Sequence, residues 1–186
     1  MLYPYHCISR IREKGIAMIH VGIRNRNFYE GLITALSIGG FFIILGFVFA
    51  FTPGITEQTS NFFSDLTTQT YTLGSTSTLS LWGPAHPASH QGFYSAVINF
   101  FIGVGVLQII VLAIRLVSHS WIRRIAQSVG DIVFWLGAAV VASVFLLEGT
   151  LNGWFQFWAS LLVLIGLSLI ARFLVYSVSR TRKQNG

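Results

Sequence analysis

Two histidines set four residues apart are the side chains best suited to chemistry in this chain of 186 residues. They lie in the stretch His86-Pro-Ala-Ser-His90, and two histidines at this spacing on one helix can bind the same metal ion. Carboxylates that could complete the ligand set are Glu57, Asp65 and Glu148. However, Pro84 and Pro87 favour a loop, and in a loop the two histidines do not lie one helical turn apart on the same face. His86 and His90 are therefore weak metal candidates, and we expect no bound metal.

The rest of the chain lacks the side chains that cofactor sites and catalysis inside a membrane require. All five histidines lie outside the long apolar stretches or at their edges, so no two imidazoles could hold a haem between two membrane helices. No Asp or Glu lies deep within such a stretch, which disfavours a proton relay or a carboxylate di-metal site. The single cysteine cannot form an internal disulfide. We expect neither a cofactor nor enzymatic activity.

The composition indicates a membrane protein. Hydrophobic residues make up 53% of the chain and charged residues only 10%. Soluble proteins carry roughly 25% charged residues, so this chain has too few to cover a surface in water. Its formal net charge of +6 is therefore interpreted in a membrane setting, with no role in binding nucleic acid.

Long gaps between charged residues predict an all-α membrane protein, a bundle of four transmembrane helices. About 20 apolar helical residues cross a hydrocarbon core of about 30 Å. The expected spans are residues 32–51, 93–117, 129–148 and 154–176. They make up a transmembrane domain at 31–178, flanked by basic tails at 1–30 and 179–186. The first apolar run is longer than the core of a signal peptide, so we expect it to be retained.

Positive charge predicts the orientation of these spans. All 12 Lys and Arg residues fall in the first tail, around the connection between the second and third spans, or at the C-terminal end from Arg172 onward. Cytoplasmic segments retain such residues, so both termini of this multi-pass cell-membrane protein are expected in the cytoplasm. The basic inner face should attract anionic lipids. The first tail either lies along the inner leaflet as an amphipathic segment or is frayed and only fixes the topology.

The connection between the first and second spans is expected on the outer side. Residues 52–92 include no Lys or Arg, and 15 of these 41 residues are Ser or Thr. Stretches 67–73 and 76–82 flank Gly74-Ser75 with alternating apolar residues, which is typical of a small β-hairpin; a flexible loop is the alternative. A short amphipathic helix on the membrane surface is predicted just before it by Phe62, Phe63 and Leu66.

Polar residues of the second span predict which face turns away from lipid. Gly105, Gln108 and Arg115 share one face, and Asn99 is a further polar residue of this span. An amide near the bilayer middle is costly to expose to lipid, so this face should point into the bundle or at a partner. Gln108 would then either line a path for a solute or bond to a serine of another helix. The candidate serines are Ser37, Ser143 and Ser168.

Small residues one helical turn apart predict close helix packing. The pairs are Ala35 with Gly39 in the first span and Ala138 with Ala142 in the third. A capping box of Ser128 and Asp131 is predicted to open the third span, because a hydroxyl and a carboxylate can satisfy free N–H groups at a helix start. Asn152-Gly153 is predicted to form the tight turn before the fourth span.

These features favour a non-catalytic membrane protein: an accessory, scaffolding or assembly subunit that packs against other membrane proteins or against itself. The alternative is an oligomeric transporter or channel subunit for a small solute or ion, with a polar path near Gln108. An enzyme acting through His86 and His90 is a third hypothesis. The four-span layout occurs in unrelated proteins and does not decide between them.

Overall fold

Four long apolar helices dominate the computed structural model, which describes residues 31–73, 77–118 and 122–184. The elements are a helix at Gly31–Phe51, helix α2 (Ile55–Ser64), strands β1 (Leu66–Leu73) and β2 (Ser77–Pro84), the 3-10 turn η1 (Pro87–His90), and helices α3 (Gln91–Val117), α4 (Ile122–Phe145) and α5 (Leu151–Gln184). The Gly31–Phe51 helix, α3, α4 and α5 are each long and apolar enough to cross a membrane. The prediction of four membrane helices is confirmed.

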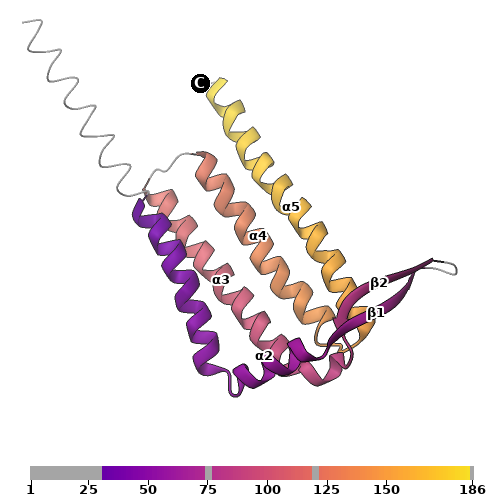
Figure 1. Ribbon diagram of the computed structural model, residues 1–186. Coiled ribbons are helices and arrows are strands. Elements are labelled where there is room, and N and C mark those ends of the chain that lie inside the picture. The colour runs from indigo at the N-terminus through magenta and orange to yellow at the C-terminus, as the bar shows by residue number, and fades with distance from the viewer. Residues whose placement is uncertain (1–30, 74–76, 119–121, 185–186) are drawn as a thin grey trace, which may run out of the picture.

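These four helices lie side by side in chain order, in an open row and not in a closed bundle (Figure 1). α4 packs against both α3 and α5, while the first helix contacts α3, for example through the rings of Phe41 and Phe100 at 5.3 Å. The apolar windows of the two outer helices are 17% and 11% buried, against 22% and 28% for α3 and α4. The outer helices therefore leave broad apolar surfaces for lipid or a partner.

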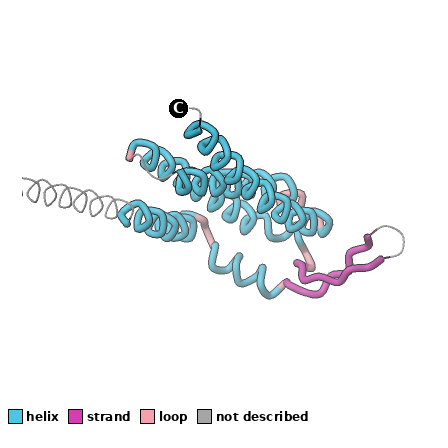
Figure 2. The backbone as a smooth tube through the Cα atoms, turned by 90° about the horizontal axis from the view of Figure 1, so that it is seen from above, coloured by secondary structure: helices cyan, strands magenta, loops and turns pink. Residues whose placement is uncertain are grey.

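The two ends of the row differ in structure. The start of the Gly31–Phe51 helix and the end of α5 lie at one end, which we call the tail end (Figure 1). α2, both strands and η1 lie at the other, which we call the hairpin end (Figure 1). Figure 2 shows the two strands extending away from the helices.

The predicted β-hairpin is present. β1 and β2 pair antiparallel from Leu66 opposite Pro84 to Leu73 opposite Ser77. The turn predicted at Gly74-Ser75 lies outside the described residues. The hairpin stands beside α5, which it contacts near its base. There Trp154 Nε1 donates a hydrogen bond to the carbonyl oxygen of Trp82 at 3.2 Å.

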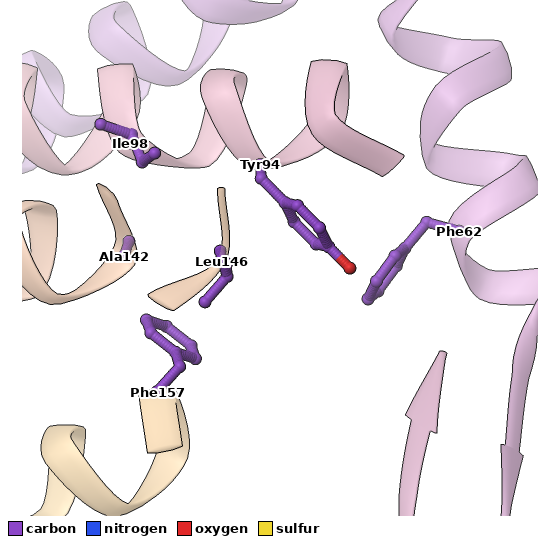
Figure 3. Close-up of a cluster of buried hydrophobic side chains, with 6 residues drawn as sticks. All are labelled: Phe62, Tyr94, Ile98, Ala142, Leu146 and Phe157. Atoms are coloured by element: carbon purple, nitrogen blue, oxygen red, sulfur yellow. The ribbon is translucent and has the colours of Figure 1, made fainter. Parts of the chain in front are cut away.

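A core of buried side chains joins the elements at the hairpin end (Figure 3). Its six residues come from α2, α3, α4, α5 and the turn that follows α4: Phe62, Tyr94, Ile98, Ala142, Leu146 and Phe157. Phe62 stacks on Phe93 with ring centroids 4.5 Å apart. α2 lies where the amphipathic helix was predicted, with Phe62 buried and Phe63 exposed, but Leu66, which the prediction included, begins β1. The apolar contacts fix its position against the membrane helices.

The connection between α4 and α5 differs from the predicted turn. Gly149 adopts a positive φ of 62°, and Thr150 Oγ1 accepts a hydrogen bond from the backbone N–H of Gly153 at 3.0 Å. Thr150 therefore caps α5, which begins at Leu151. The prediction of a turn at Asn152-Gly153 is wrong because the threonine hydroxyl starts the helix before those residues.

Candidate functional site

Asp65 connects both candidate histidines at the hairpin end. His86 Nδ1 lies 2.9 Å from Asp65 Oδ1, and His90 Nε2 lies 2.9 Å from Oδ2. The backbone N–H of His86 also donates to Oδ2 at 2.8 Å. His90 is 7% exposed and His86 is 79% exposed. One carboxylate thus ties the end of α2 to the segment that leads from the hairpin into α3.

The register of the hairpin brings these residues together. Because Leu66 pairs with Pro84, the residues just outside the pair must be neighbours as well. The backbone N–H of Ala85 donates to the Asp65 carbonyl at 3.0 Å and extends the ladder by one step. From the sequence, Asp65 was considered only as a metal ligand. Pairing the ends of the two predicted strands would have placed it beside His86.

The cluster has the geometry of a hydrogen-bonded latch. Each imidazole directs a ring nitrogen at an oxygen of the Asp65 carboxylate. Among the described residues no three His, Cys, Asp or Glu side chains are grouped to hold a metal ion. Both imidazoles are placed to donate a hydrogen bond to the Asp65 carboxylate.

Hydrogen bonds keep Asp65 charged. The bond from the His86 side chain is the main cause that holds the pKa of Asp65 well below its usual range. The His86 backbone N–H and the His90 side chain add to this effect, while partial burial opposes it. The latch accordingly depends on a carboxylate that stays ionised except in strong acid.

A second polar cluster lies at the tail end, where Arg115 is 8% exposed. Its Nη1 donates to the carbonyl oxygen of Arg124 at 2.8 Å and to Ser128 Oγ at 2.6 Å. Arg172 of α5 donates through Nη2 to Asp131 Oδ1 of α4 at 2.6 Å. These contacts fasten α3, α4 and α5 to one another near their ends.

The predicted capping box is wrong. α4 begins at Ile122, so Ser128 and Asp131 lie inside the helix, where the backbone N–H groups already have helical partners. Neither side chain is needed as a cap. Ser128 accepts from Arg115, and Asp131 pairs with Arg172. Both polar side chains therefore serve contacts to neighbouring helices and not the start of α4.

The polar face of the second span packs against α4. Gly105 is buried, and a Cβ atom there would overlap the side chain of Leu136. Phe101, on the same face, lies 5.8 Å from Trp135 between ring centroids. Gln108 shares this face and is half-buried. Asn99 is instead exposed, in a cavity of about 470 Å³ between α3 and the Gly31–Phe51 helix.

The expected hydrogen bond from Gln108 to a serine of another helix is absent from the described residues. The three candidate hydroxyls each donate to a carbonyl of their own helix: Ser37 to Ile33, Ser143 to Val140 and Ser168 to Ile165. That expectation is wrong because a serine in an apolar helix finds its nearest acceptor one turn back along its own backbone.

Replacing Gln108 with leucine should therefore leave the fold intact. A half-buried amide without a described hydrogen-bond partner costs free energy, and leucine has a similar size. We expect the free energy of unfolding in detergent to stay unchanged or to rise by about 1 kcal/mol. A variant that folds and assembles but loses a measured solute flux would instead support the transporter hypothesis.

The small residues differ in their surroundings. Ala138 and Ala142 of α4 are fully buried, and Ala142 belongs to the core at the hairpin end. Ala35 is exposed, and a Cβ atom at Gly39 would meet nothing within 4 Å. The first helix instead turns Gly40 toward Leu107 of α3. The predicted stripe of this helix thus faces away from the described chain.

A deep apolar groove separates the hairpin from the membrane helix beside it. Its volume is about 600 Å³. The lining residues come from β2 and α5: Leu79, Leu81, Trp82, Trp154, Phe155, Trp158, Ala159 and Leu162. The hydrogen bond from Trp154 to the Trp82 carbonyl fixes the angle between its two walls.

Any functional assignment has to start from these clusters and surfaces. No model of a known protein family matches the chain, and neither does any curated protein or solved structure.

Proposed function

We propose that this protein is a non-catalytic subunit of the cell membrane, which packs against another membrane protein as an accessory, scaffolding or assembly factor. The groove between β2 and α5 is the observation that carries the proposal. It lies at the free edge of the helix row, on the helix whose apolar window is only 11% buried. An open edge with a preformed groove is a suitable docking surface for a partner.

The charge of the two ends supports an orientation with both termini in the cytoplasm. The described cations all lie toward the tail end: Arg115, Arg123, Arg124, Arg172, Arg180, Arg182 and Lys183. The described residues of the hairpin end, from 52 to 92 and from 146 to 153, include no Lys or Arg. Since Lys and Arg are retained on the cytoplasmic side, the hairpin and the groove would lie on the outer side.

The wall of the groove outside the membrane favours a protein partner. Leu79, Leu81 and Trp82 of β2 are 43%, 42% and 70% exposed. Lipid would cover α5, but the hairpin extends away from the membrane helices (Figure 2). A partner whose transmembrane helix runs along α5 and ends beneath β2 would cover both walls. We therefore assign the groove to a transmembrane helix of a partner.

Replacing Leu81 with serine tests this docking surface. Loss of a central apolar contact should lower the recovery of the partner complex after mild detergent extraction about tenfold. Phe63→Ser is the matched control, because Phe63 is 63% exposed at the same end but does not line the groove. The mass of the extracted particle and the yield of the bound partner are the measurements.

The control variant should leave the complex at the wild-type yield. An equal loss of the complex in both variants would indicate non-specific association through exposed apolar residues and would contradict the assignment of the groove. Recovery of the wild-type chain as a lone monomer from its native membrane would count against the accessory role itself.

A further inference from the structure

A second cavity lies between α4 and α5 near the tail end, on a different part of the molecule from the groove. Its volume is about 600 Å³. The lining residues are Arg123, Ala126, Gln127, Arg172, Phe173 and Tyr176. Two guanidinium groups, an amide and a phenol thus border one cavity, together with an aromatic ring and a methyl group. This combination of cationic and apolar walls suits a ligand that carries both an anionic group and an apolar part.

The Arg172 side chain is held at this cavity by α4. It lies across Gly130, where a Cβ atom would overlap its aliphatic part, and it reaches Asp131 at 2.6 Å. That hydrogen bond uses one of the five N–H donors of the guanidinium, so donors remain for an anion. Asp131 offsets only one positive charge, which leaves the charge of Arg123 uncompensated among the lining residues.

We propose that this cavity binds the phosphate of an anionic phospholipid. The guanidinium groups of Arg123 and Arg172 would donate to the phosphate oxygens, since planar guanidinium groups match phosphate geometry. Gln127 adds a further donor. The inference concerns the opposite end of the protein from the docking groove, so it stands independently of the accessory role.

The apolar residues identify a lipid as the source of the phosphate. Phe173 is 68% exposed on α5 and lies one residue from Arg172, on a helix that is apolar enough to cross the bilayer. A phosphate held by the two arginines would place the acyl chains of the same molecule along this surface. Arg123 lies at the start of α4, and Arg172 lies opposite the first turns of α4 on α5, toward the level at which lipid headgroups are found.

Native mass spectrometry of the full-length protein in detergent tests the site. Phosphatidylglycerol, phosphatidylcholine and inorganic phosphate are titrated separately onto the wild type, Arg123→Ala and Arg124→Ala. Arg124 is the matched control. It carries the same charge as the neighbouring Arg123, but its side chain does not line the cavity. We expect Arg123→Ala to weaken phosphatidylglycerol binding about tenfold and Arg124→Ala to change it less than twofold.

The expected pattern also includes weaker binding of phosphatidylcholine and no competition by millimolar inorganic phosphate. Equal losses in both variants would show that diffuse surface charge attracts the lipid and would overturn the site. Displacement of phosphatidylglycerol by inorganic phosphate would overturn the lipid as its occupant, in favour of a soluble anion. Thermal unfolding of both variants without lipid should match the wild type, because Arg123 is exposed.

Discussion

Replacing Gly149 with valine is expected to destabilise the hairpin end by about 3 kcal/mol. Gly149 has a φ of 62°, a conformation that is strained for any residue with a Cβ atom and most of all for a β-branched one. A Cβ atom there would also lie 2.9 Å from the Cα of Ala88 in η1. Because that neighbour is backbone, the clash cannot be relieved by rotating a side chain. The free energy of unfolding in detergent measures the effect.

The matched control is Gly166→Val, at a position in α5 where a Cβ atom would meet nothing within 4 Å. Valine is a better helix former than glycine, so this variant should equal or slightly exceed the wild type in stability. The fluorescence of Trp82 and Trp154, which meet at the base of the hairpin, reports on the local packing. A Gly149→Val protein as stable as the control would contradict the close contact between the α4–α5 connection and η1.

The membrane spans were predictable because each one is encoded by a continuous stretch of the sequence. A run of apolar residues of bilayer length needs no knowledge of neighbours, and three of the four helices begin within a few residues of the expected position. The start of α4 was missed for the opposite reason. Whether Ser128 caps a helix depends on Arg115 of another helix, and no local pattern contains that information.

The packing of the helices was only partly predictable, because a helix surface that faces lipid has the same composition as one that faces another helix. The bundle expected from the sequence is an open row (Figure 1). In the first helix, Gly39 and Gly40 are adjacent, and spacing alone selected the wrong one. The branched side chain of Leu107 on the opposing helix determines that Gly40 makes the contact.

The candidate sites show the same division between local and long-range information. Alternating apolar residues predicted both strands of the hairpin. The positions of the Lys and Arg residues predicted that positive charge gathers at one end of the helices, the tail end. The groove requires the angle between β2 and α5, which a hydrogen bond between Trp154 and Trp82 sets across 72 positions of sequence. The role of Asp65 likewise depends on strand register, which local patterns do not determine.

Replacing Asp65 with alanine is expected to cost about 3 kcal/mol of unfolding free energy, because it leaves the buried His90 without its acceptor. The side chain of Asp65 is 18% exposed, so water can compensate only part of the loss. Asp65→Asn should cost less, about 1–2 kcal/mol, since the amide oxygen still accepts one hydrogen bond. Glu57→Gln in α2, the helix that ends just before Asp65, removes a carboxylate without a described ion pair; it is the control and should be neutral. Chemical unfolding in detergent at pH 7 ranks the three variants.

Acid should weaken the same latch in the wild type. The pKa of Asp65 is depressed in the folded protein, whereas an unfolded aspartate has a pKa of about 3.9. The carboxylate therefore contributes its full stabilisation above that unfolded value, and the contribution declines as pH falls from there toward the folded pKa. In Asp65→Asn this component is missing, so the stability difference between the two proteins should shrink as pH falls below about 4. A difference that stays constant down to pH 2 would show that the charge of Asp65 does not hold α2 to the histidine segment.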